Sequence, residues 1–202
     1  LRTDGDKLFI DYPHLTRGTG YVSPSVMLEF GARSTGEPAS PRDIVCDAAS
    51  VIEGVEFPTA RPRVMHAERT FWEKATAIHV FCLQNRMRGD RFSRHWHDVA
   101  RLDDAGIAAV AIQDHALATA VARHKTMFFA EKAADATWID YGAATCGQLQ
   151  LAPSGAALDA LADDYRRMAE DSLLATTPEP FGDLMDRCAD IARRANAASK
   201  SS

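Results

Sequence analysis

One stretch, residues 67–102, constrains the fold more than any other part of the chain. Its sequence, AERTFWEKATAIHVFCLQNRMRGDRFSRHWHDVARL, holds two blocks of apolar residues at helical spacing, joined by a polar connector that contains glycine. The apolar stripe of the first block is Phe71, Ala75, Ile78 and Cys82, and that of the second is Trp96, Val99 and Ala100. This pattern predicts two helices, each with one buried face.

The same two helices carry the densest group of chemically capable side chains in the chain. These are Glu68, Arg69, Glu73 and Lys74 on the first helix and Arg94, His95, His97 and Asp98 on the second. Lys74 lies at the margin of the apolar stripe, so we expect it to be half sheltered from water. One interpretation is a functional site. In the other, Lys74 pairs with Glu73 or Glu68 on a solvated face, and Asp98 pairs with Arg94 one turn away.

The residues before this stretch read as short strands that form a small mixed or antiparallel sheet. We expect strands at 7–12, 21–33, 55–57 and 63–66, with a short helix at 42–52. In the second strand Val26, Leu28 and Phe30 alternate with Met27, Glu29 and Gly31. We expect the first set to face the core, which directs Glu29 to the opposite face.

The residues after it continue as helices. Helical patterns cover 107–112, 115–129, the segment that follows Ser154, and the segment from Phe181, with a loop at 135–153. Ser154 is the predicted N-cap of its helix. The fold class is therefore α+β, with a sheet region at 1–66 and a helical region at 67–202 that carries the ERTFWEK and RHWHD motifs.

Charge and cysteine content limit the classes of partner and compartment. The 202 residues carry a formal net charge of −5, which argues against wholesale electrostatic capture of nucleic acid. Basic residues are nevertheless dense between Arg86 and Arg101, so a local phosphate-binding surface is compatible with the sequence. The 4 cysteines are widely spaced and no apolar run has membrane-spanning length, which favours a cytoplasmic protein without a membrane partner.

Three segments in order carry a family resemblance: GYVSPSVMLEFGAR, RVMHAERTFWEKATAIH and RFSRHWHDVARL. Together they resemble the nucleotidyltransferase AbiEii/AbiGii toxin family, a branch of the minimal, DNA polymerase β-like nucleotidyltransferases. The family pattern is an E-R-T-F-x-E-K helix followed by an R-H-x-x-D helix. The resemblance implies a partial nucleotidyltransferase sheet followed by a C-terminal helical bundle.

The first signature of that family, a glycine-containing turn followed by a D-x-D/E pair on a strand, is absent. Asp4 and Asp6 have the right spacing, but no Gly-Ser turn precedes them, and we interpret them as solvated turn residues. The chain is thus expected to be the C-terminal portion of such a protein, with its N-terminal part missing and only part of the active site present. On this interpretation the chain alone is inactive.

The resemblance also implies roles for individual residues. Nucleotidyl transfer needs carboxylates that hold divalent metal ions, here Mg²⁺ or Mn²⁺, and Glu29 is the candidate metal ligand. The expected catalytic residues are Glu29, Lys74 and Asp98. The expected nucleotide-binding residues are Arg69, Glu73, Lys74, Arg94 and His95.

The implied activity is transfer of a nucleotide from an NTP to an RNA or protein acceptor, tRNA included. The implied setting is a toxin–antitoxin or phage-defence system, with a cognate antitoxin as partner. The alternative is a non-catalytic module that binds that antitoxin or an acceptor RNA, because a helical surface with a basic tract serves binding equally well.

Overall fold

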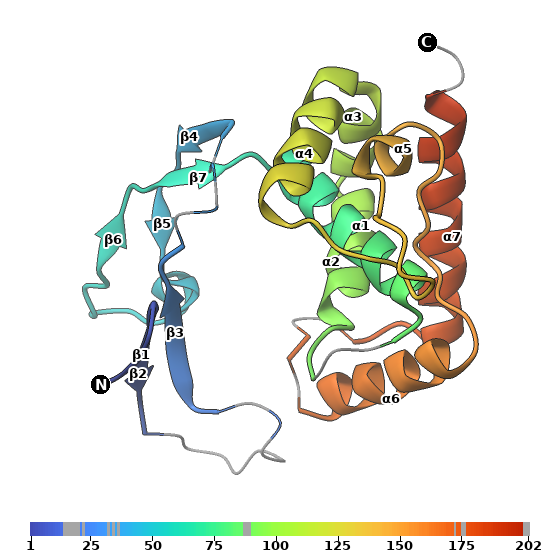
Figure 1. Cartoon of the computed structure of the whole chain (residues 1–202). Helices are drawn as coiled ribbons and strands as arrows, with labels where there is room; N and C mark the ends of the chain where they lie inside the picture. Colours follow the sequence, from blue (N-terminus) through green and yellow to red (C-terminus); the bar gives the residue numbers. More distant parts are fainter. Residues whose placement is uncertain are drawn as a thin grey trace.

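A computed structural model describes residues 1–13, 21, 23–31, 33, 35, 37–86, 90–171, 173–174 and 177–199. Strands occupy the first part of the chain and helices the rest, which confirms the α+β class (Figure 1). Residues 14–20, between the first two predicted strands, lie outside the described residues. No helix in the described part of the chain is long and apolar enough to cross a membrane.

The described strands form three small antiparallel sheets rather than one. Strands β1 (Arg2–Asp4), β2 (Lys7–Asp11) and β3 (Ser25–Glu29) make a three-stranded sheet in that order. Strand β4 (Ala39–Pro41) pairs with β7 (Arg63–Met65), and β5 (Ile44–Val45) pairs with β6 (Thr59–Ala60). The strand predicted at 55–57 is wrong, and the helix predicted at 42–52 is only a 3₁₀ turn, Asp47–Ser50.

The prediction that one face of β3 packs against the core is wrong. Val26 pairs with Ile10 and Leu28 with Leu8 across the sheet, yet Val26 is 50% exposed, Leu28 41% and Phe30, just after the strand, 65%. Alternation assigns side chains to two faces but does not decide which face another element covers. Here the covering element is absent among the described residues, so both faces are open.

In the described part of the chain, seven α-helices follow the strands. They are α1 (Ala67–Gln84), α2 (Arg94–Asp104), α3 (Ile107–Gln113), α4 (His115–Phe128), α5 (Tyr141–Thr145), α6 (Ala156–Glu170) and α7 (Phe181–Ala198). Helix α1 ends where Asn85 adopts a left-handed conformation, with φ of 48°. Ser154 does not cap α6, because the N-cap is Gly155 and no side chain bonds there. Helix α5 interrupts the predicted loop at 135–153.

Helix α1 lies in the middle of the bundle and supplies much of its core (Figure 1). Phe71, Ile78 and Trp96 are 0% exposed, so the predicted stripes are the buried faces. The buried indoles of Trp72 and Trp96 donate to backbone carbonyls of Ala111 and Leu151, at 2.9 and 2.7 Å. These bonds remove the cost of an unpaired buried N–H and fix α1 and α2 against later elements.

One buried carboxylate connects three distant parts of the chain. Asp164 on α6 is 2% exposed and accepts from Tyr21 Oη at 2.6 Å, Arg91 N at 2.8 Å, Ser93 N at 2.9 Å and Ser93 Oγ at 2.8 Å. Burial by itself would raise the pKa of Asp164, but the bonds from Tyr21 and Ser93 outweigh it and the pKa lies below its ordinary value. Asp164 thereby fixes the start of α2.

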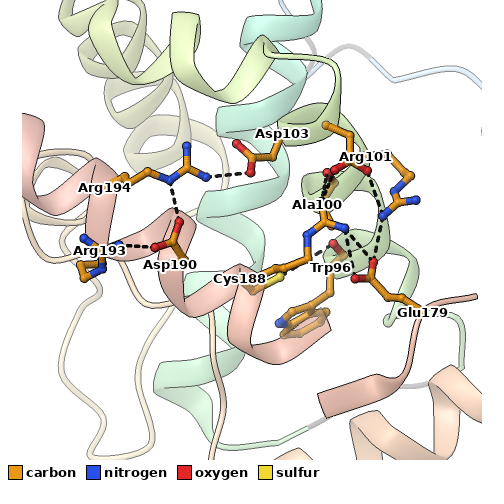
Figure 2. Close-up of polar contacts among 11 residues, drawn as sticks. Trp96, Ala100, Arg101, Asp103, Glu179, Cys188, Asp190, Arg193 and Arg194 are labelled. Atoms are coloured by element: carbon orange, nitrogen blue, oxygen red, sulfur yellow. Dashed lines mark hydrogen bonds and ion pairs between the residues drawn. The ribbon is translucent and has the colours of Figure 1, made fainter. Parts of the chain in front are cut away.

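Ion pairs fasten α7 to α2. Arg194 on α7 bonds Asp103 of α2 at 2.7 Å and Asp190 on its own helix at 2.8 Å (Figure 2). Arg187 donates to the carbonyl of Ala100 at 3.0 Å and to Glu179 at 3.1 Å. Helix α2 is therefore held at its start by Asp164 and along its length by α7.

Candidate active site

The structure brings Lys74 of α1 and Asp98 of α2 together. Lys74 Nζ donates to Asp98 Oδ2 at 2.6 Å. The two side chains keep 25% and 38% of their surface exposed, so the pair is sheltered yet open to a ligand. Neither alternative pairing, of Lys74 with Glu73 or of Asp98 with Arg94, is the one the structure forms. The ion pair spans two helices instead.

Glu73, the neighbour of Lys74, lies among basic side chains. Its carboxylate bonds Arg69 at 3.0 Å and Lys125 of α4 at 2.5 Å, and His124 Nδ1 lies 3.7 Å away. Arg69 retains 6% of its side-chain surface and Lys125 12%. Two permanent cations face one carboxylate here, which leaves a local positive charge beside Lys74 that favours an anionic ligand.

His124 links this cluster to the strand region. Its Nε2 lies 2.7 Å from the backbone oxygen of Arg33, and a carbonyl can only accept, so we assign the ring proton to Nε2. Its Nδ1 is then an acceptor, 3.4 Å from Arg69 Nη2. The Arg33 guanidinium and Lys125 Nζ both lie over the Phe129 ring, at 5.3 and 4.9 Å.

The two remaining predicted nucleotide-binding residues stand at the start of α2. Arg94 is its first residue and is exposed. Burial, together with the positive charges of Lys74 and Arg94, lowers the pKa of His95 to about 4, so its imidazole is neutral near pH 7. His95 Nδ1 is buried without a hydrogen-bond partner in the described part of the chain.

Glu29 is not brought to this site. It ends β3 opposite Lys7, is exposed, and lies in the strand region apart from α1 and α2 (Figure 1). The described residues contain no cluster of three or more metal-ligating side chains. Asp98 already bonds a lysine, so the described residues do not fit a bound Mg²⁺ or Mn²⁺.

A small cavity adjoins the Lys125 side of the cluster. Its volume is about 190 Å³, and its lining residues are Ala77, Val80, Phe81, Lys125, Phe129, Glu131 and Tyr141. Ala77 and Phe81 lie one and two turns beyond Lys74 on α1. The apolar floor with a charged rim suits a flat ring that carries an anionic group.

Sequence reasoning missed Arg33, His124 and Lys125. No motif marks these residues, because they reach the cluster from elements distant in sequence, at separations of 91 and 55 residues for the two His124 contacts. The one available signal was the pair of adjacent basic side chains near the end of α4.

A family model for the nucleotidyl transferase AbiEii toxin of type IV toxin–antitoxin systems matches residues 1–187. The chain belongs to this family. No curated protein and no solved structure matches it.

Membership of the AbiEii family has two direct consequences for the site. The family is one of nucleotidyl transferase toxins, and a toxin of a type IV toxin–antitoxin system has an antitoxin partner. The family match also spans both the strands and the Lys74–Asp98 pair. The expected N-terminal nucleotidyltransferase segment before Leu1 stays a prediction.

Proposed function

We propose that the protein transfers a nucleotide from an NTP to a hydroxyl group on an acceptor RNA, such as a tRNA, or on an acceptor protein. The Lys74–Asp98 ion pair supports this most directly, because it presents a cation and a carboxylate side by side within a positively charged surface. We place this activity in the cytoplasm, which the four free cysteines favour.

In this mechanism the basic side chains bind the triphosphate. Lys74 leaves Asp98 to contact a phosphate oxygen, and Arg94 and Arg69 supply further positive charge. His95 is neutral and can donate or accept a hydrogen bond to the bound nucleotide. The neighbouring Glu73 holds Arg69 in place and prevents the cations from repelling one another.

Asp98 then acts on the acceptor. The acceptor oxygen attacks the α-phosphorus, forming a new P–O bond, while the bond from that phosphorus to the oxygen bridging to the β-phosphate breaks and pyrophosphate leaves. Asp98, released from Lys74, accepts the hydroxyl proton. Positive charge from Lys74 stabilises the charge that develops on the phosphate oxygens.

Dependence on Mg²⁺ or Mn²⁺, with Glu29 as a ligand, stays a prediction. The described residues contain no cluster of three or more metal-ligating side chains, and the proposed mechanism therefore uses protein side chains only. Loss of transfer on chelation with EDTA, and its recovery with Mg²⁺, would support the requirement. If a Glu29→Ala variant transfers nucleotide at the wild-type rate, Glu29 is not a catalytic residue.

The test measures NTP binding and nucleotide transfer separately in the complete protein. We expect Lys74→Ala to weaken NTP binding by at least roughly tenfold, since it removes a charge-assisted contact. We expect Asp98→Asn to bind NTP but to transfer α-labelled nucleotide about 10²-fold more slowly, because it cannot accept the proton. Arg166→Ala removes an exposed arginine on α6 and is the control for losing one positive charge outside the site.

The second candidate function is a non-catalytic module that binds the cognate antitoxin or an acceptor RNA. The open apolar faces of β3 favour it, because exposed apolar surface of this kind often marks a protein interface. The catalytic proposal would be contradicted if Lys74→Ala and Asp98→Asn bound NTP and labelled the acceptor as wild type does. The non-catalytic binding module would then be the remaining candidate.

A further inference from the structure

A hairpin on the far side of the small cavity presents an exposed tryptophan. Trp138 is 67% exposed, whereas Trp72 and Trp96 are 2% and 0% exposed. Lys132 pairs with Trp138 across the hairpin, and its Nζ lies 4.8 Å from the ring centroid. A large aromatic ring with the Lys132 ammonium over one face is thus held in water, where burial does not explain it.

The hairpin is fixed to the end of α1. Gln84 donates to the carbonyl of Lys132 at 2.9 Å, and the Ala134 N–H donates to the carbonyl of Leu83 at 3.0 Å. Its turn places Ala136 at φ of 67°, a left-handed conformation that is uncommon for a residue other than glycine. The Trp138 ring is therefore presented by a rigid backbone, so little ordering is lost when a ligand binds.

Trp138 borders a cavity of about 600 Å³, whose charged lining residues are Arg86, Glu131 and Lys132. Glu131 also lines the smaller cavity next to Lys125, so the two hollows are neighbours. The Glu131 carboxylate accepts from Gln84 at 3.2 Å, whereas Arg86 is exposed. From Lys125 to Trp138 the two hollows present the Phe129 and Trp138 rings and the cations of Lys125, Lys132 and Arg86, with the Glu131 carboxylate between them.

We propose that Trp138, Lys132 and Arg86 bind an unpaired nucleotide of a single-stranded RNA. The base stacks on Trp138, and its phosphates contact Lys132 and Arg86. Single-stranded nucleic acid matches this surface because every base has a flat face and every linkage a negative charge. This binding site lies beyond the Lys74–Asp98 pair and does not depend on the proposed transfer reaction.

The test is a fluorescence titration of the whole chain with a short oligouridylate. Because Trp138 is the exposed indole, stacking should quench emission on the red side of the spectrum and leave the buried Trp72 and Trp96 contributions unchanged. Affinity measured by anisotropy of labelled RNA should fall roughly five- to 150-fold in Trp138→Ala. Trp138→Phe, which keeps a flat ring, should retain most of the affinity, and Lys132→Ala should reduce the salt dependence of binding.

Three results would overturn the proposal. One is unchanged Trp138 emission at saturating oligouridylate, and another is equal affinity for double-stranded RNA, whose bases are stacked out of reach. The third is tighter binding of oligodeoxythymidylate than of oligouridylate, which would reject RNA as the ligand. Lys74→Ala keeps the hairpin intact and should bind oligouridylate like wild type, so failure of this site and failure of nucleotide transfer are separable.

Discussion

At the scale of single residues, neighbouring side chains on α1 have different partners. Glu73 and Lys74 are adjacent, yet Glu73 points to Arg69 and Lys125 while Lys74 points to Asp98. Successive residues on a helix are separated by about 100°, so adjacent residues face different neighbours. The E-K motif therefore serves two clusters, one that is mostly buried and one that is open to a ligand.

Two buried histidines make stability depend on pH. Burial lowers the pKa of His79 to about 4 and that of His95 to about 4, against about 6.5 in an unfolded chain. As pH falls from 6.5 to 4 the unfolded state takes up protons that the folded state does not, so folding stability decreases over that window. Each histidine contributes up to about 3 kcal/mol to this loss.

The prediction concerns His79, whose Nδ1 accepts from Gln150 N at 3.1 Å. His79→Asn keeps an acceptor and removes the titrating ring, so the free energy of unfolding should fall less steeply between pH 6.5 and 4. Urea denaturation at several pH values measures how the free energy of unfolding changes with pH. His115→Asn is the control for an exposed imidazole, and a wild-type slope in His79→Asn would contradict the assignment.

Sequence reasoning placed the helical site residues well and the strand residue poorly. Lys74 and Asp98 meet because the helical period of each segment fixes which face packs, and the two segments are neighbours in the chain. Glu29 failed to join them because a strand of five residues says nothing about its distant neighbours. The proximity of His124 and Lys125 to Glu73 arises from tertiary folding, which no local sequence pattern encodes.

At the scale of elements, a few arginines add polar contacts to the apolar packing of α7 against α2. Arg187 bonds Glu179, Asp104 and the Ala100 carbonyl, and 30% of its side chain is exposed. These contacts reach both α2 and the segment before α7, so they act as a clamp across helices. A substitution of Arg187 should therefore weaken this contact measurably.

We expect Arg187→Met to lower the free energy of unfolding by about 2 kcal/mol, because it keeps the apolar stem but leaves charged partners unpaired. Arg193→Met is the matched control: its side chain is 73% exposed and pairs only within α7, so its loss should cost under about 0.5 kcal/mol. Chemical denaturation compares the two. Equal losses would show that Arg187 does not clamp the helices.

The longer helices and the strands β2 and β7 were predictable to within a few residues, and the shortest elements were not. Helix α1 was recognised from an apolar stripe of several turns, a signal that tertiary contacts rarely override. Strands β5 and β6 have two residues each, too short for any periodic signal. The missed α5 is equally short, and its N-cap Asp140 was the one local sign.

At the scale of the whole molecule, the core belongs to the helical region. The main buried cluster begins at Phe71 and ends at Ala195, while the strand region is tied to it through Tyr21 and the Arg33 carbonyl. Few of the residues before α1 are buried, so these sheets add little to the free energy of folding.

A fragment of residues 67–199 should therefore fold on its own. We expect its free energy of unfolding to be about 2 kcal/mol lower than that of the whole chain, because the Tyr21–Asp164 and Arg33–His124 hydrogen bonds are lost. Circular dichroism during thermal unfolding measures it. Trp96→Ala in the fragment is the control and should abolish the transition, and a fragment that melts without cooperativity would contradict the expectation.

The Asp164 contacts also set an order of events during synthesis. Tyr21 and Asp164 are 143 residues apart, so Tyr21 leaves the ribosome long before its partner exists. At elongation rates of roughly 5–20 residues per second, that delay is on the order of ten seconds. Throughout it Tyr21, Arg91 and Ser93 have no Asp164 carboxylate to bond, so the start of α2 is fixed only after α6 has been made.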